Sequence, residues 1–101
     1  MKIRFEWDAI KAASNLTKHR VSFEVAARVF ADPYLLTNQD RVENGERRWQ
    51  SIGMVDGYLV LLVAHTVGED DDSTEVIRII SARKAEPKER KRYEQDREIR
   101  G

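Results

Sequence analysis

The residues Glu75–Ala85, with the sequence EVIRIISARKA, constrain the fold more than any other stretch of this chain. The run is rich in Val and Ile, whose branched side chains favour the pleated, packed surface of a β-strand. Arg78 nevertheless stands in its middle and Arg83 near its end. Because burying an unpaired charge is costly, Arg78 must meet a partner, extend its guanidinium to solvent along a packed stem, or face a functional site. We therefore expect a buried strand that carries two arginines.

Length and composition indicate one domain over residues 1–101. A chain of 101 residues can form one modest core, and its 36% charged and 41% hydrophobic residues are typical of a folded chain. The absence of cysteine excludes disulfides, thiol nucleophiles and cysteine metal sites. The longest apolar run, Tyr58–Ala64, is too short to cross a bilayer, and MKIRFEWD has no apolar signal core. We expect a cytoplasmic protein with no membrane partner.

The charge is unevenly distributed, although the formal net charge is +0. Basic residues predominate over residues 83–92, whereas acidic residues predominate over residues 66–75. A neutral chain can still present a basic face. The zero net charge therefore does not exclude a nucleic-acid partner.

The N-terminal third predicts a strand followed by two helices. Residues 2–7 alternate polar and apolar, as a half-buried strand does. Asp8 is suited to cap a helix that runs to about His19, and Ser22 to cap a second helix over Phe23–Ala31. In the first helix we expect a buried stripe of Ala9, Ala12, Ala13 and Leu16. A second stripe, facing either solvent or a ligand, consists of Lys11, Asn15 and Lys18.

The middle of the chain predicts an antiparallel meander. A short strand is expected near Leu35–Asn38, followed by a polar loop over Arg41–Glu46 with an Asn-Gly turn signal. Asp56-Gly57 is a typical hairpin turn. The strands of the meander are expected at Arg47–Gly53, Tyr58–Val67 and Glu75–Arg83.

The terminal segment is predicted to be a helix from Pro87 to about Glu98, because proline suits the first helical turn. Tyr93 is its only aromatic residue, and nearly all its other side chains are charged. Most helical stability in proteins comes from packing an apolar face. We therefore expect this helix to need RNA or a protein partner to become fully ordered.

Strand register decides which side chains share a face of the sheet. A two-residue turn at Asp56-Gly57 would place Arg48 opposite His65, and a hairpin closed by Val67–Thr74 would place Val63 opposite Arg78. One face would then gather Arg48, Gln50, His65 and Arg78. The other face, expected to be the core under the two helices, would gather Trp49, Tyr58, Val60, Leu62, Ile77 and Ile79. Arginines and a histidine together suit a phosphate and a proton transfer.

This inference depends on loops of even length, and an odd loop or a bulge would break it. His65 alone is also compatible with a purely structural role. The sequence has no Gly-rich phosphate loop, no metal-ligand spacing around its two histidines and no Ser-His-Asp order. We therefore expect no metal and no cofactor, and chemistry built on Arg, Lys, His and Tyr.

The sequence resembles the BrnT family in motifs that follow one another along nearly the whole chain. These are FEWD at 5–8, Lys11, Asn15, KH at 18–19, VSF at 21–23, ERR at 46–48, IG at 52–53, HT at 65–66, IRIISARKA at 77–85 and ERKRYE at 89–94. The resemblance implies an α+β, RelE-like ribonuclease fold with two N-terminal helices on an antiparallel meander and a C-terminal helix. It also implies a toxin of a type II toxin–antitoxin system that cleaves RNA and halts translation. A BrnA-like antitoxin would neutralise it in a hetero-oligomer and would alone contact operator DNA.

Two features depart from the family pattern. Arg20 stands where the family usually has a glycine that ends the first helix in the left-handed conformation, a substitution that costs about 1 kcal/mol. The acidic loop GEDDDST is also longer than the family pattern leads us to expect, and its charge would repel RNA from that end of the molecule.

Two functions remain open. An endoribonuclease would use the ribose 2′-OH to attack the adjacent phosphate, leaving a 2′,3′-cyclic phosphate without a metal. The expected catalytic residues are Arg78 and Arg83 as phosphate stabilisers, His65 or Lys18 as proton carrier, and Tyr93 as an auxiliary donor. The expected substrate contacts are Arg48, His19, Lys11 and Lys84. The alternative is a non-catalytic antitoxin-binding subunit that acts in an operon-repressing complex.

Overall fold

A five-stranded sheet organises the molecule, in the spatial order β1-β5-β4-β3-β2. The computed structural model describes residues 2–101. Its strands are β1 (Ile3–Glu6), β2 (Leu36–Glu43), β3 (Glu46–Val55), β4 (Leu59–Glu69) and β5 (Glu75–Lys84). Strands β2 to β5 form an antiparallel meander, and β1 pairs with β5 in parallel. The predicted α+β class is confirmed, but the sheet is mixed rather than purely antiparallel, because the long connection from β1 to β5 permits a parallel pair.

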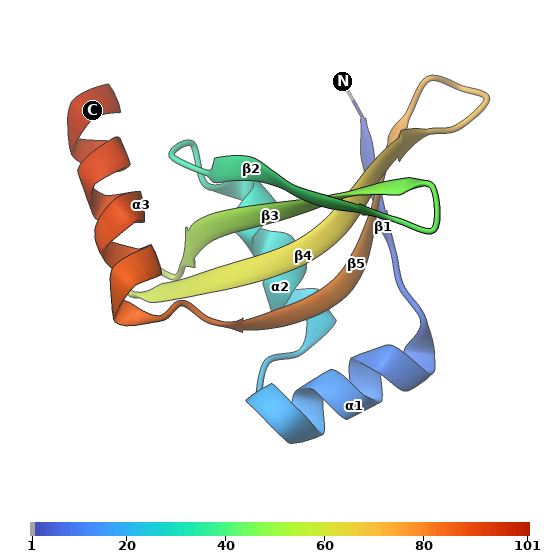
Figure 1. The fold of residues 1–101 in the computed structure, drawn as a ribbon, viewed down its shortest axis with the longest axis horizontal. Coiled ribbons are helices and arrows are strands. Elements are labelled where there is room, and N and C mark those ends of the chain that lie inside the picture. Colours follow the sequence, from blue (N-terminus) through green and yellow to red (C-terminus); the bar gives the residue numbers. More distant parts are fainter. Residues whose placement is uncertain (1) are drawn as a thin grey trace.

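The helices lie on different sides of this sheet (Figure 1). One face of the sheet is covered by α2 (Phe23–Ala27) and the 3₁₀ turn η1 (Arg28–Ala31), and we call it the covered face. The opposite face, called the open face, looks toward the viewer in Figure 1 and is flanked at one end by α3 (Pro87–Arg100). Helix α1 (Ala9–His19) runs alongside the outer edge of β5.

Two hydrophobic clusters hold the layers together. The larger lies on the covered face and combines residues before and within α2 and η1 with residues of the strands: Val21, Phe23, Ala26, Val29, Val55, Leu61, Val63, Ile77, Ile79 and Ala82. The smaller lies under α3 on the open face and consists of Ile52, Val60, Leu62 and Tyr93. Alternating residues of β4 thus supply both clusters, as expected for a central strand.

The hairpin registers differ from the prediction, which was wrong in both hairpins. The β3–β4 turn contains three residues, so Val55 pairs with Leu59 and Trp49 lies opposite His65. In the β4–β5 hairpin, Thr66 pairs with Arg78 and His65 with Ile79, and a bulge lies between His65 and Ala64. An odd loop reverses which face each later side chain occupies.

This shift redistributes the predicted faces. His65 lies on the covered face, away from Arg48, Gln50 and Arg78, so the expected four-residue constellation does not form. Of the six residues expected in the core under the early helices, Ile77 and Ile79 lie there, whereas Val60 and Leu62 pack under α3 and Tyr58 is 72% exposed. Trp49 is half-buried. It pairs with His65 across the β3–β4 ladder and belongs to neither buried cluster.

The first helix turns a different side inward from the one predicted. Ala12 is half-buried and Asn15 is buried, whereas Ala9, Ala13 and Leu16 are exposed. The reason is hydrogen bonding. The Asn15 amide nitrogen donates to the carbonyls of Val21 (2.9 Å) and Ala82 (2.8 Å), and its oxygen accepts the N–H of Ala82 at 3.1 Å. At the edge of β5, the Asn15 side chain thus makes the hydrogen bonds to Ala82 that the backbone of a neighbouring strand would otherwise make.

The remaining element boundaries follow the prediction closely. The second helix begins at Phe23, with the Ser22 hydroxyl accepting the Val25 N–H at 3.1 Å, and tightens into a 3₁₀ turn before Asp32. Strand β2 extends further than expected, so that the predicted loop shrinks to the turn at Asn44-Gly45, where both residues have positive φ. Arg20 adopts the left-handed conformation with φ 60°, the geometry usually given to glycine.

Helix α3 is fixed to the sheet through Tyr93, the one buried residue of this helix. The Tyr93 hydroxyl donates to the Asp32 carboxylate, which also accepts the N–H groups of Met54 and Tyr34, both at 2.8 Å. We predicted that this helix needs a partner to become fully ordered. In the structure, the buried Tyr93 already attaches it to the rest of the chain through Asp32. Over residues 2–101, every helix is too short or too polar to cross a membrane.

Candidate functional site

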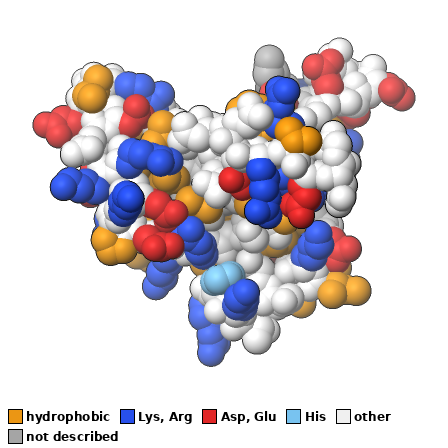
Figure 2. Space-filling view, viewed as in Figure 1, with side chains coloured by type: hydrophobic (Ala, Val, Ile, Leu, Met, Phe, Trp, Pro, Cys, Tyr) orange, Lys and Arg blue, Asp and Glu red, His pale blue; other side chains and the backbone are white. Residues whose placement is uncertain are grey.

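Three arginines project from the open face of the sheet: Arg48 on β3 and Arg78 and Arg83 on β5. Each side chain is partly accessible, with exposed fractions of 18%, 43% and 32%. Figure 2 shows basic and acidic side chains interspersed on this face. Every one of the three guanidinium groups lies within 4 Å of a carboxylate of the same chain.

The shortest of these contacts joins Arg78 to Glu46, the first residue of β3. The Arg78 Nη2 donates to the Glu46 Oε1 at 2.6 Å, and the Arg48 Nη2 lies 3.9 Å from the same oxygen. The Arg48 Nε is buried without a hydrogen-bond partner among residues 2–101. The Glu46 carboxylate thus lies within 4 Å of two arginines, the more exposed Arg78 and the more buried Arg48.

A hollow of about 370 Å³ opens beside this pair. Thr66, the buried neighbour of Arg78 across the ladder, contributes to its lining. The charged residues of the lining have both signs: Arg4, Arg47, Arg78, Glu6, Glu46, Glu69 and Asp70. Because guanidinium groups bind phosphate oxygens with strong, directional hydrogen bonds, Arg78 is the group beside Glu46 that is suited to bind a phosphate.

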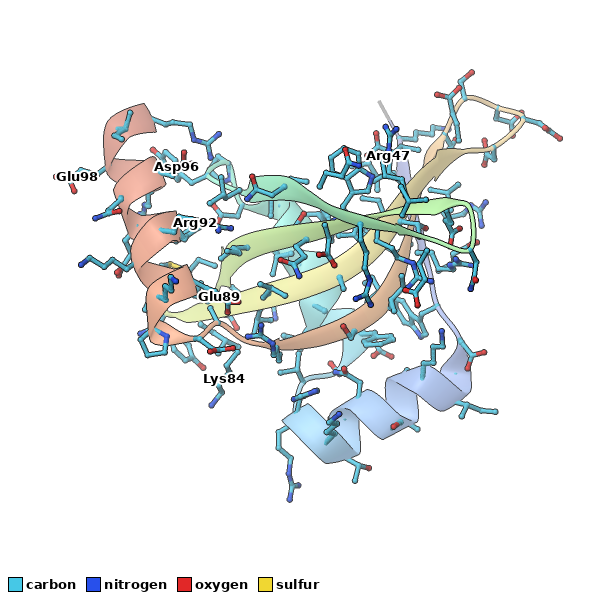
Figure 3. All side chains as sticks on the ribbon, in the orientation of Figure 1. Arg47, Lys84, Glu89, Arg92, Asp96 and Glu98 are labelled. Atoms are coloured by element: carbon cyan, nitrogen blue, oxygen red, sulfur yellow. The ribbon has the colours of Figure 1, made fainter. Side chains whose placement is uncertain are left out.

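Arg83 forms a separate cluster with the beginning of α3. Its guanidinium donates to both carboxylate oxygens of Glu89 at 2.8 and 2.9 Å, a bidentate geometry. The hydrogen bond from Arg83 lowers the pKa of Glu89, and the same bond raises the pKa of Arg83. Glu89 also accepts the Glu86 N–H at 2.8 Å as part of a capping box. Figure 3 shows Glu89 and Arg92 on the side of α3 that faces the sheet.

The two arginine clusters cannot converge on one phosphate in this conformation. Arg83 lies five positions after Arg78 on the same strand, a span of about 16 Å along a regular strand. Their head groups also point to different partners, Glu46 at the start of β3 and Glu89 on α3. The clusters therefore fit two positions along one extended ligand.

A third basic group lies between α1 and the edge of β5. Lys11, Lys18 and His19 line a hollow of about 340 Å³ together with Ser81 of β5. These three residues were expected to take part in binding or catalysis, and the structure brings them together, away from the Arg78–Glu46 pair. Lys84, another expected contact, is exposed at the end of β5 and points away from α3 (Figure 3).

His65 is enclosed on the covered face and is only 1% exposed. Its Nε2 lies 2.7 Å from the Ser51 hydroxyl, and its ring packs edge-on against Phe30 with 4.9 Å between centroids. Burial lowers the pKa of His65, against a smaller opposing effect of the Thr66 carbonyl. The imidazole is thus a neutral structural group with no access to a ligand on the open face.

Tyr93 is likewise fully buried, and its hydroxyl is bonded to Asp32. Burial and that bond raise the pKa of Tyr93 far above its ordinary value. Burial alone would raise the pKa of Asp32, but hydrogen bonds from Tyr93, Met54 and Tyr34 outweigh it and hold this pKa below its usual range. The tyrosine is placed to anchor α3 rather than to touch a substrate.

Sequence reasoning missed Glu46 and Thr66 at this site. Glu46 belongs to the ERR motif and Thr66 to the HT motif, but the prediction took only Arg48 from the first motif and His65 from the second. The available signal was the alternation of β4: if His65 faces the core, its neighbour Thr66 must face the arginines. Among residues 2–101, the structure contains no group of three His, Cys, Asp or Glu side chains arranged to hold a metal ion.

Comparison with known proteins identifies the family. A sequence model described as "Ribonuclease toxin, BrnT, of type II toxin-antitoxin system" matches residues 7–89, a range that includes Glu46, Arg78 and Arg83 but not Tyr93. The 1.1 Å crystal structure of the Brucella abortus ribonuclease toxin BrnT has a similar fold, with a TM-score of 0.58 and 23% identity over 85% of this chain and 99% of that one. No curated protein matches this chain in sequence.

The family match covers well over half of the chain, and its description implies an RNA substrate and an antitoxin partner. The chain therefore belongs to the BrnT ribonuclease toxins of type II toxin–antitoxin systems.

Proposed function

We propose that this toxin is an endoribonuclease that cleaves RNA without a metal ion, through attack of a ribose 2′-OH on the adjacent phosphate. The products would be a 2′,3′-cyclic phosphate and a free 5′-OH. The observation that carries the proposal is the Arg78 guanidinium, 43% exposed beside a hollow and held at 2.6 Å by a carboxylate. A positioned cation of this kind stabilises the charge that develops on a phosphorane.

The other basic groups would bind the RNA on either side of the reacting phosphate. Arg48 would add positive charge close to Arg78, because both guanidinium groups lie within 4 Å of the Glu46 carboxylate. Arg83 is placed about 16 Å along the strand and would take a different phosphate of the same RNA. Lys11, Lys18 and His19 form a further basic hollow beyond the edge of β5. Lys18 stays a candidate proton carrier for the leaving oxygen.

We further propose that the partner is a BrnA-like antitoxin, which would neutralise the toxin in the cytoplasm and alone contact operator DNA. The helix arrangement is proposed to be RelE-like. Two observations support this partner: the family motifs in the sequence, and the carboxylates that Arg78 and Arg83 bind. Arg78 and Arg83 already bind carboxylates of their own chain, so an acidic antitoxin segment could bind them in the same way.

The test uses the purified full-length chain and a short RNA, in buffer with EDTA. Wild-type protein should produce ends with a 2′,3′-cyclic phosphate, and Arg78→Ala should cleave about 10²–10³-fold more slowly because a positioned cationic donor is lost. Arg28→Ala is the matched control, since Arg28 pairs with Asp56 outside the open-face clusters. Tyr93→Phe should also keep cleaving, because the hydroxyl is buried.

Three outcomes would contradict the proposal. Cleavage that requires added magnesium would contradict the metal-free mechanism. Products without a cyclic phosphate would contradict attack by the 2′-OH. An Arg78→Ala variant that melts like wild type and cleaves at the wild-type rate would remove Arg78 from the site.

A further inference from the structure

Glu46 is held at the start of β3, next to the hollow that Arg78 also lines. It is the first residue of β3, directly after the Asn44-Gly45 turn, in which both residues have positive φ. This tight turn fixes the start of the strand, because few other conformations close a hairpin so compactly. The Glu46 side chain remains 42% exposed and lines the hollow beside Arg78.

The proposed reaction needs a group that accepts the proton of the attacking 2′-OH. His65, which was expected to carry this proton, is 1% exposed on the other face of the sheet. Tyr93 is fully buried, and Lys18 lies in the separate hollow beside α1. Glu46 is the carboxylate that contacts Arg78 directly, within 2.6 Å. A phosphate held by Arg78 would therefore bring its neighbouring ribose next to this carboxylate.

We propose that Glu46 is a catalytic residue that accepts the 2′-OH proton, an inference that rests on the ribonuclease mechanism proposed above. The Glu46 carboxylate takes the proton as the 2′-oxygen forms a bond to phosphorus. The bond from phosphorus to the 5′-oxygen then breaks, and this oxygen leaves with the bonding electrons and is protonated by solvent. Arg78 donates hydrogen bonds to the non-bridging oxygens throughout, and Glu46 later returns its proton to solvent.

A neighbouring glutamate serves as a matched control. Glu43 lies 3.9 Å from the Arg48 Nη1 and 3.3 Å from Arg41, but it does not contact Arg78 and does not line the hollow. If a carboxylate near the arginines were enough, Glu43 and Glu46 would have similar effects on cleavage. The proposal assigns the effect to Glu46 alone.

The experiment measures single-turnover cleavage of a short RNA by full-length protein at pH 7, together with binding of the same RNA carrying a 2′-deoxy sugar at the cleaved position. Glu46→Gln keeps the size of the side chain and an oxygen that can accept from Arg78, but removes the basic carboxylate. Its cleavage rate should fall about 10²–10⁴-fold, the usual contribution of a general base, whereas its affinity for the 2′-deoxy RNA should stay within about threefold of wild type, because Arg78 still holds the phosphate. Glu43→Gln should keep both the rate and the affinity within about threefold.

Glu46→Asp provides a second variant that retains a carboxylate. It should cleave more slowly than wild type, because the carboxylate is displaced, but faster than Glu46→Gln. Thermal melting of every variant shows whether it is folded. If Glu46→Gln does not fold, Glu46→Ala takes its place and should be slower than Glu46→Asp, and equal rates of these two variants would contradict a role for the carboxylate.

The results distinguish this inference from the mechanism on which it rests. Wild-type cleavage of an RNA with a 2′-deoxy sugar at the cleaved position, or products without a cyclic phosphate, would contradict the mechanism itself. Wild-type formation of the cyclic phosphate together with full activity of Glu46→Gln would overturn the role of Glu46 only. A slow Glu46→Gln variant that also binds the 2′-deoxy RNA much more weakly than wild type would make Glu46 a positioning residue for Arg78 and would also overturn the proposal.

Discussion

On the covered face of the sheet, Ser51 and His65 are buried and bonded to each other, whereas on the open face Arg78 and Glu46 pair while keeping 43% and 42% of their side chains exposed. The buried groups are an uncharged hydroxyl and an imidazole whose charged form burial disfavours. The open-face groups are a guanidinium and a carboxylate that form an ion pair. The sheet thus separates neutral hydrogen-bonded groups from ion pairs by face.

Desolvation explains this division. A neutral polar group that keeps its hydrogen bonds is buried at little net cost, whereas a charge loses far more hydration energy when it is enclosed. The groups suited to binding phosphate must therefore stay on the half-open face. It follows that substitutions on the covered face should change the free energy of unfolding, and those on the open face should change RNA cleavage.

The largest effect on stability is expected at Asn15, where one amide serves three backbone groups of Val21 and Ala82. Asn15→Ala removes three hydrogen bonds and leaves their partners unsatisfied, which should lower the free energy of unfolding by about 2–4 kcal/mol. Asn15→Asp should be worse, because a carboxylate oxygen would then face two carbonyl oxygens. Denaturant unfolding followed by circular dichroism measures both.

Ser14→Ala is the control for this measurement, since Ser14 is exposed on the same helix and should change stability by less than about 0.5 kcal/mol. Equal stability of Asn15→Ala and wild type would show that α1 is held by other contacts. The helix would then not depend on the edge of β5.

Substitutions of two glycines, one on each face, test how tightly each face is packed. Their expected effect on the free energy of unfolding is smaller than that of Asn15→Ala. A Cβ on Gly53 would lie 2.8 Å from the Val29 Cβ and 3.0 Å from the Val29 carbonyl oxygen of η1, whereas a Cβ on Gly68 would meet nothing within 4 Å. Gly53→Ala should therefore cost about 1–3 kcal/mol through overpacking. Gly68→Ala should be neutral or add up to about 1 kcal/mol, because alanine restricts the unfolded chain.

Thermal or denaturant unfolding of both variants decides this point. If Gly53→Ala were as stable as wild type, η1 could move away from the sheet without loss, and the covered face would be less tightly packed than its buried residues indicate. A large loss in Gly68→Ala would show instead that the open face is closed over β4 in solution.

The secondary structure could be predicted from the sequence because hydrophobic periodicity and capping residues are local signals. Asp8 and Ser22 begin their helices as expected, and Asn44-Gly45 forms the expected turn. Register was not predictable in the same way, because it depends on whether Tyr58 belongs to the turn or to β4. That choice depends on packing across the whole sheet, since moving the register by one residue exchanges the buried and exposed sides of the strand.

The candidate site was predicted only in part for the same reason. Arg48 and Arg78 lie on one face as expected, since β3 and β5, on either side of β4, both turn these side chains to the open face. His65 was assigned to that face by the wrong register. Asn15 was expected to meet solvent or a ligand, but it bonds to backbone groups of Ala82 that lie far away in the sequence, a contact that no periodicity signals.

The smallest expected effect concerns the pH dependence that His65 gives to stability. Burial lowers the pKa of His65 below its ordinary value of 6.5. The carbonyl of Thr66 can only accept, so Nδ1 donates to it at 3.3 Å and Nε2 accepts from the Ser51 hydroxyl. The folded state therefore keeps a neutral ring while the unfolded state takes up a proton. Because the unfolded state binds more protons, the free energy of unfolding should fall as the pH drops below about 6.5, until the folded-state pKa is passed.

Chemical denaturation at a series of pH values between 8 and 5 measures this fall, and His65→Gln should flatten it. His19→Gln is the control and should leave the fall in place, because His19 lies outside the buried core. Asp32 and Glu89 also have lowered pKa values, but their ordinary values are 3.8 and 4.5, so their stabilisation is lost only at lower pH. A stability that stays constant from pH 8 to 5 in the wild type would mean that the folded protein accepts a proton on His65. The covered face would then open enough to admit water, and the division between the two faces would not hold.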